Sequence, residues 1–284
     1  MGAAGQYPGS ALRLARALDE QTRRETLAGG IPALIAHPDW EGAAPLVLWM
    51  HGRTSRKEID SGRYLRLIRA GIAVCAIDLP GHGDRFEAHL QEPQGTADLL
   101  ELAQPDVDRV MEALLEGPHA SMFNAERLGI GGISAGGMVT LRRLCEPHGF
   151  SCAAVEATTG WLEGLYFPDQ FPGKASTRRW PVEHSRDAVR AIDPMAHLDS
   201  FEPLPLLAMH SEKDELVPFE LQQRFTDALR AHYRQRGADA GMVELVSWPE
   251  TGAPMEHLGF GRHAHEAKNM QIEFFKRHLL DAEA

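Results

Sequence analysis

Cysteine is scarce in this 284-residue chain, and its three cysteines do not form a pattern that predicts a disulfide framework. Cys75 and Cys152 lie in apolar runs, as is typical of small buried residues. No apolar stretch is long enough to span a membrane, and the first twenty residues contain no signal-peptide core. From these absences we expect a cytoplasmic protein that does not associate with membranes.

Basic residues are in deficit, because 29 lysines and arginines stand against 40 aspartates and glutamates, a formal net charge of −11. A chain of this sign repels phosphate backbones, so we do not expect nucleic acid as a partner. The rest of the composition, with 43% hydrophobic and 24% charged residues, is ordinary for a globular protein with a sizeable core.

Apolar runs alternate with segments of helical spacing along most of the chain. The first two strands flank Gly29-Gly30, which is a hairpin signal. Buried strands are expected near 45–52, 72–79, 127–134, 151–159, 203–210 and 242–248, and helices near 11–20, 58–70, 96–116, 136–145, 219–236 and 264–280. The alternation predicts an α/β fold, with a mostly parallel twisted sheet, helices on both faces and an antiparallel N-terminal edge. We divide the chain into a helical extension, 1–21, and one domain, 22–284.

Residues 159–195 interrupt this alternation with aromatic residues and prolines. We interpret them as a short cap insertion above the carboxyl edge of the sheet, where open α/β sheets bind ligands. Trp161, Tyr166 and Phe171 are candidates for the wall of a substrate pocket. The same aromatics would serve equally well as the core of a lid.

The stretch "GGISAGG", residues 131–137, stands between an expected strand and an expected helix. This is the context of a nucleophile elbow, in which a sharp turn exposes a serine hydroxyl above the sheet. Gly132 and Gly136 would flank Ser134 because side chains there would clash where the chain reverses. Ser134 is therefore the candidate nucleophile. The alternative is that Ser134 is only a small residue at a junction between a strand and a helix.

A carboxylate should follow the next strand but one, and "LLAMHSEKDELVP" supplies it. Asp214 lies in the loop just beyond the strand and would fix the tautomer of a histidine base. Glu212 and Glu215 are rivals that we expect to face solvent.

The base should lie in a loop after the last strand. His257 follows Trp248 by nine residues in a loop that contains glycine and proline. His263 and His265 fall at the start of the last helix, where we expect a solvent-exposed pair and no metal site. His257 is therefore the candidate base.

Acyl transfer to a serine also needs donors for the oxyanion. One is expected to be the backbone N–H of Ala135, directly after the nucleophile. The second is expected to be the backbone N–H of Arg53, in the loop "HGRTSRKE" that follows the first buried strand of the domain. His51 and His82 are interpreted as structural residues, with His51 bracing this loop.

Together, "HGRTSRKE", "DLPGHGDR", "GISAGG", "HSEKDELVP" and "GAPMEH" make the chain resemble the α/β-hydrolase superfamily over roughly residues 22–281. It is most similar to the branches that include dienelactone hydrolase, prolyl-oligopeptidase-type catalytic domains and acetyl esterases. The resemblance implies an α/β-hydrolase fold and a serine hydrolase that needs neither cofactor nor metal.

The expected substrate is a small-molecule carboxylic ester with a small or medium acyl group. Peptidase, thioesterase and lactonase activities on the same residues stay open, as does a homodimer. A non-catalytic ligand-binding protein on the same fold is the alternative from another class, and it predicts an incomplete triad.

Overall fold

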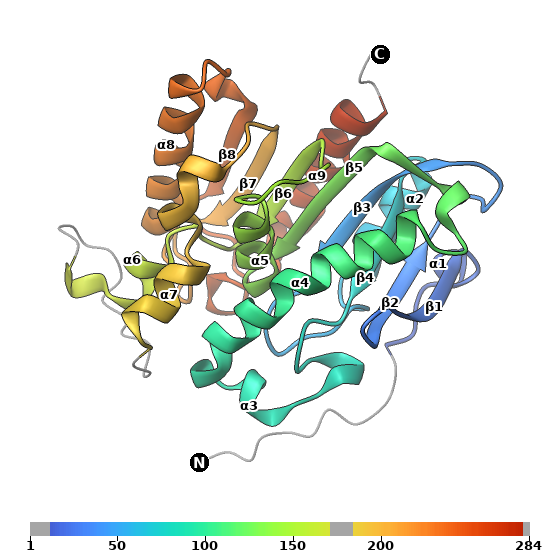
Figure 1. Ribbon diagram of the computed structural model, residues 1–284, viewed down its shortest axis with the longest axis horizontal. Helices are drawn as coiled ribbons and strands as arrows, with labels where there is room; N and C mark the ends of the chain where they lie inside the picture. The colour runs from blue at the N-terminus through green and yellow to red at the C-terminus, as the bar shows by residue number, and fades with distance from the viewer. Residues whose placement is uncertain (1–11, 171–183, 281–284) are drawn as a thin grey trace.

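A twisted sheet is the centre of the protein, whose computed structural model describes residues 12–170 and 184–280 (Figure 1). Within these residues the sheet has eight strands in the order β1-β2-β4-β3-β5-β6-β7-β8. They are β1 (Thr22–Leu27), β2 (Ile31–Ala36), β3 (Ala44–Met50), β4 (Ala73–Ile77), β5 (Phe123–Ile133), β6 (Cys152–Glu156), β7 (Leu206–Ser211) and β8 (Val243–Trp248).

The antiparallel edge expected from the sequence is present. Gly29 and Gly30 turn the chain between β1 and β2 with φ values of 78° and 75°, a conformation that costs glycine little. β2 also pairs with β4 in the antiparallel sense. All further neighbours in the sheet are parallel.

Helices cover both faces of the sheet because the strands are apolar on both faces. Leu46 and Leu48 of β3 face one layer, whereas Val47 and Trp49 face the other. The first layer contains α4 (Thr96–Leu115), α5 (Ala135–Arg143) and α8 (Phe219–Gln235), and the second contains α1 (Arg16–Asp19), α2 (Ser61–Arg69) and α9 (Ala264–Leu279) (Figure 1). A short helix, α3 (Ala88–Gln91), precedes α4 and was not anticipated from the sequence.

The interruption expected in the alternation lies between β6 and β7. Its described part contains two short helices, α6 (Leu162–Tyr166) and α7 (Arg186–Ile192), which lie side by side (Figure 1). Phe171, one of the candidate pocket residues, lies outside the described residues.

One buried carboxylate holds the two ends of this segment together. Asp193 follows α7 and accepts hydrogen bonds from the backbone N–H groups of Leu162 (3.0 Å), Glu163 (2.9 Å) and Met195 (3.1 Å). Burial raises the pKa of Asp193 to about 6, although these N–H donors act in the opposite direction. The start of α6 is therefore held by the residue that ends α7.

The ends of several elements differ from the sequence expectation by a few residues. β3 ends at Met50, before the His51-Gly52 turn, and the helical part of the N-terminal extension is Arg16–Asp19 within the described residues. In the part of the chain that the structure describes, no helix is both long and apolar enough to cross a membrane.

Candidate active site

Ser134 occupies a strained turn between β5 and α5, with φ 53° and ψ −116°. A side chain at Gly132 would collide with the backbone of Gly136, and a side chain at Gly136 would collide with the carbonyl of Met50. Both glycines are therefore required for the reason expected from the sequence. Positive φ at a residue other than glycine is costly and persists where the surroundings impose it.

Hydrogen bonds on both sides hold this turn. The N–H of Ser134 donates to the carbonyl of Glu156 at the end of β6, at 2.9 Å. The hydroxyl of Thr158 donates to the carbonyl of Ser134 at 2.8 Å, and the N–H of Met138 donates to the same carbonyl at 3.0 Å. The serine is thus fixed to the neighbouring strand and to its own helix, and its side chain remains partly exposed.

His257 connects Ser134 to Asp214. Its Nε2 lies 2.9 Å from the Oγ of Ser134, and its Nδ1 lies 2.7 Å from the Oδ2 of Asp214. The three side chains predicted as nucleophile, base and acid therefore form one hydrogen-bonded chain. The other two candidate bases lie elsewhere: His263 contacts Glu266, and His265 contacts Asn269.

Asp214 is held by its own loop. Its Oδ1 accepts from the N–H groups of Leu216 and Val217, both at 2.8 Å. The Nε2 of His210 lies 3.4 Å from Oδ2, a contact that the sequence did not lead us to expect. Burial raises the pKa of Asp214, but hydrogen bonds to His210 and His257 outweigh it, so the pKa lies below its usual value.

The two rival carboxylates belong to exposed residues, as expected from the sequence. Glu212 accepts a hydrogen bond from the hydroxyl of Ser247 at 2.8 Å. Glu215 contributes its backbone N–H, which donates to the carbonyl of Met255 at 3.1 Å and so joins the acid loop to the histidine loop.

Glu256, which directly precedes His257, is a second link between these loops. Its carboxylate accepts from the hydroxyl of Ser211 at 2.6 Å, at the end of β7. It also accepts from the N–H and the hydroxyl of Thr251, at 2.6 and 2.8 Å, and from the N–H of Gly252, at 2.6 Å. The hydrogen bond from Ser211 is the largest cause of a pKa lowered to about 2, so Glu256 is ionised at neutral pH.

The histidine loop needs such a tie because its backbone is strained. Met255 and Glu256 have φ values of 54° and 51°, and neither is glycine. Glu256 could not be identified from the sequence because its partner Ser211 is 45 residues away. The one available signal was a carboxylate beside the candidate base in "GAPMEH".

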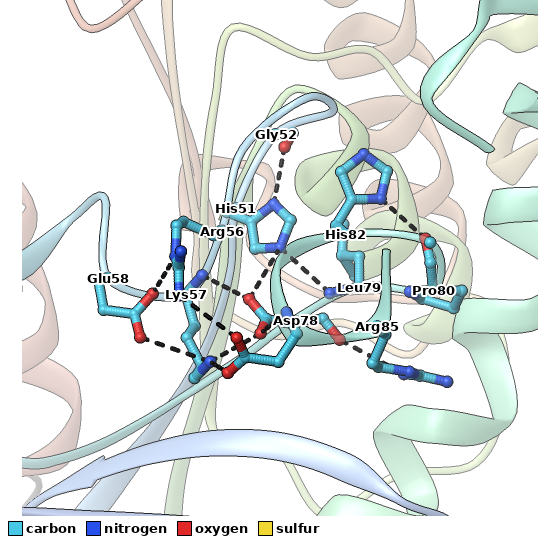
Figure 2. A network of polar contacts seen from close by, with 12 residues as sticks. His51, Gly52, Arg56, Lys57, Glu58, Asp78, Leu79, Pro80, His82 and Arg85 are labelled. Atoms are coloured by element: carbon cyan, nitrogen blue, oxygen red, sulfur yellow. Dashed lines mark hydrogen bonds and ion pairs between the residues drawn. The ribbon is translucent and has the colours of Figure 1, made fainter. Parts of the chain in front are cut away.

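The loop that follows β3 borders the serine, since a Cβ on Gly52 would lie 3.3 Å from the Cβ of Ser134. His51 braces this loop, as expected (Figure 2). Its Nδ1–H donates to the carbonyl of Gly52 at 2.7 Å, and its Nε2 accepts from the N–H of Leu79 at 3.1 Å. His82 also has a structural contact, from its Nδ1–H to the carbonyl of Pro80 at 2.8 Å.

The candidate pocket residues differ in their surroundings. Trp161 is only 8% exposed and packs in the hydrophobic core. This agrees with a packing role, the alternative to a place in the pocket wall. Tyr166 is partly buried and shares a hydrogen bond with Thr96, and the Nη1 of Arg53 donates to the same threonine hydroxyl at 2.5 Å. Tyr166 therefore links the cap to the loop beside Ser134.

Metal ligands are not grouped at this site. Among residues 12–170 and 184–280, no set of three or more histidine, cysteine, aspartate or glutamate side chains is placed to hold a metal ion.

Comparisons with known proteins agree with this architecture. The model of the prolyl oligopeptidase family matches residues 61–281. The chain is 28% identical over 264 residues to esterase YjfP of Escherichia coli strain K12, a match that covers 88% of this chain and 96% of that protein.

Two solved structures show the same fold at lower identity. The acylaminoacyl peptidase of Pyrococcus horikoshii has a TM-score of 0.68 at 18% identity, covering 93% of this chain and 42% of that one. The Pyrococcus furiosus esterase Pf2001 has a TM-score of 0.62 at 19% identity, covering 98% of this chain and all of that one. The fold is that of the α/β-hydrolases, in an esterase-like branch.

His51 predicts a pH dependence of stability. Burial is the main cause of its pKa falling to about 4 from a usual 6.5, so the unfolded chain binds a proton at a higher pH than the folded chain does. The stability that neutral His51 contributes is complete above about pH 6.5 and is lost as the pH falls towards 4. The free energy of unfolding, measured by urea denaturation from pH 7 to pH 4, should therefore fall less steeply in His51→Asn than in the wild type. Equal slopes would contradict this assignment.

Proposed function

The chain belongs to the prolyl oligopeptidase family and is a hydrolase, and we propose that it cleaves carboxylic esters of small or medium acyl groups through an acyl-enzyme on Ser134. The observation that carries the proposal is the hydrogen-bonded chain from Ser134 through His257 to Asp214. This arrangement activates a serine hydroxyl for attack on a carbonyl carbon.

The proposed reaction has two steps. His257 takes the proton of Ser134 as its oxygen attacks the ester carbonyl, and then gives that proton to the departing alcohol. Water, activated by the same histidine, next cleaves the acyl-enzyme and releases the acid. Asp214 keeps Nδ1 of His257 protonated and stabilises the imidazolium that forms in each step.

The oxyanion would be held by the backbone N–H groups of Ala135 and Arg53. Ala135 is the first residue of α5, where N–H groups have no partner within the helix and the helix dipole favours negative charge. Arg53 follows Gly52, and a Cβ on Gly52 would lie 3.3 Å from the Cβ of Ser134, which supports a role for this loop at the reacting serine.

The share of each relative's length that this chain matches favours ester cleavage over peptide cleavage. Esterase YjfP is matched over 96% of its length, whereas the acylaminoacyl peptidase is matched over only 42% of its chain. Peptidase or thioesterase activity on the same residues is the second candidate. Comparing esters, thioesters and anilides of the same acyl group separates these three reactions.

The non-catalytic alternative predicts a triad with a missing or misplaced member. The contacts of 2.7 and 2.9 Å around His257 support catalysis instead.

Replacement of the nucleophile tests the proposal. Ser134→Ala should lower kcat on a p-nitrophenyl ester by about 10⁴-fold or more, as the loss of a triad member does elsewhere. Its circular dichroism spectrum should match that of the wild type, and its thermal midpoint should be no lower, since the substitution removes no contact in the hydrophobic core. His263→Ala serves as the control and should keep full activity. A Ser134→Ala protein with a tenth of wild-type turnover would overturn the assignment.

Glu256 should support the base without joining the reaction. Glu256→Gln weakens one hydrogen bond that ties the histidine loop to β7 and three hydrogen bonds within that loop, so kcat/KM should fall by about tenfold through misplacement of His257. The loss should be equal at pH 6 and pH 8, because Glu256 is ionised at both. The matched control is Glu212→Gln, whose hydroxyl partner Ser247 lies outside the site. If both variants lose the same activity, Glu256 has no special role.

The cap should select the acyl group without changing the chemical step. Tyr166→Ala should shift the ratio of kcat/KM for butanoate over octanoate esters by about tenfold, the range that pocket contacts reach. Labelling of Ser134 by a small fluorophosphonate should persist. Tyr166→Phe removes only the hydroxyl near Thr96 and separates its effect from that of the ring. An unchanged ratio in a folded Tyr166→Ala protein would assign Tyr166 to the internal packing of the cap.

A further inference from the structure

A buried ion pair lies at the far end of the loop that begins at His51 (Figure 2). The carboxylate of Asp78 is fully buried and receives two hydrogen bonds from one residue: the backbone N–H of Lys57 at 2.8 Å and its Nζ at 2.7 Å. The N–H of Asp84 adds a third at 2.9 Å. Gly83 leaves the room for this arrangement, since a side chain there would collide with the carboxylate.

The near end of the loop is anchored on Leu79, the residue that follows Asp78. The N–H of Leu79 donates to Nε2 of His51, whose Nδ1–H donates to the carbonyl of Gly52. Asp78 and Leu79 therefore hold both ends of the loop that contains Arg53 (Figure 2).

These anchors determine the direction of one N–H group. The peptide between Gly52 and Arg53 is trans, so its carbonyl and its N–H point in opposite directions. Because the Gly52 carbonyl points at His51, the Arg53 N–H points away from His51. Thr54, the next residue, has a φ of 59°, a conformation that the loop would not keep without restraint.

We propose that the buried Lys57–Asp78 pair is the positioning element of the oxyanion site, fixing the peptide that presents the Arg53 N–H beside Ser134. Lys57 and Asp78 touch no reacting atom in this scheme, and His51 carries their effect to Gly52. The proposal rests on the proposed function, because it assumes that an oxyanion forms at Ser134.

Charge and burial explain why this pair suits the task. A donor aimed at a developing charge stabilises it most when the donor is already oriented and need not reorganise. Lys57 is 3% exposed and Asp78 is fully buried, so water competes little for either. A loop held by neutral contacts alone would more easily rotate the Gly52–Arg53 peptide.

The test measures kcat, KM and the inhibition constant of a trifluoromethyl ketone, whose adduct with Ser134 places an oxyanion in the hole. In Lys57→Met, kcat should fall at least tenfold, and by less than the roughly 10²–10³-fold caused by deleting one donor outright. The inhibition constant should rise by the same factor, and KM should stay within twofold. A purely structural role would lower the thermal midpoint without this parallel change.

Asp84→Ala is the matched control. Asp84 is the exposed partner of the same lysine, and its removal leaves the Lys57–Asp78 contact and its own backbone donor in place. This variant should keep kcat and the inhibition constant within twofold of the wild type.

Asp78→Asn provides the second route if Lys57→Met does not fold. It should show the same parallel loss, and the double variant should lose less than the two single losses combined, because both changes break the contact between the Nζ of Lys57 and the carboxylate of Asp78. A folded Lys57→Met or Asp78→Asn protein with wild-type kcat and inhibition constant would overturn the proposal while leaving the esterase assignment intact.

Failure of the esterase assignment has a different signature. If the wild type cleaves no ester, the rate at which a fluorophosphonate labels Ser134 replaces kcat, since attack on phosphorus uses the same hole. Slower labelling of Lys57→Met than of Asp84→Ala would then support the positioning role. Equal labelling rates would overturn it.

Discussion

The close packing of the Ser134 turn against the end of β3 is the constraint on which the site depends. A side chain at Gly136 would collide with the carbonyls of Met50 and His51, so the start of α5 rests directly on the residues that begin the loop after β3. The two expected oxyanion donors therefore come from two elements that touch at this point. Moving either element would separate the donors from each other as well as from the serine.

A second buried ion pair stands behind the same turn. Glu156, whose carbonyl accepts from the N–H of Ser134, pairs with Arg63 at 2.5 Å, and both side chains are almost fully buried. Arg63 also lies over the ring of Trp49 at 3.9 Å. Buried pairs add little net stability, but loss of one partner leaves an uncompensated charge. Their consequence here is geometric, because a buried charge that leaves its partners is left uncompensated, which restrains the position of each residue.

Periodicity and motif spacing predicted the sheet, its antiparallel edge and the residues that converge on His257. These features depend on local pattern, or on the rule that parallel strands bring their carboxyl ends to one edge. The contacts of Glu256 with Ser211 and of Lys57 with Asp78 were not predictable in this way. Each joins two loops whose approach depends on tertiary packing, and no apolar period marks either partner.

The groups that restrain the loops around the triad differ in pKa from the group that restrains the cap. His51 and Glu256, with pKa values lowered to about 4 and about 2, keep one charge state throughout the neutral range. Asp193, which holds the start of α6, has a pKa raised to about 6 by burial. On acidification from neutral pH, Asp193 is therefore the first of these three to change its charge. Its protonated form accepts backbone hydrogen bonds more weakly, so the restraint on the cap weakens while the loops around Ser134 keep theirs. Below about pH 6, the segment that is proposed to select the acyl group therefore loses part of its restraint before the residues proposed to carry out the reaction lose theirs.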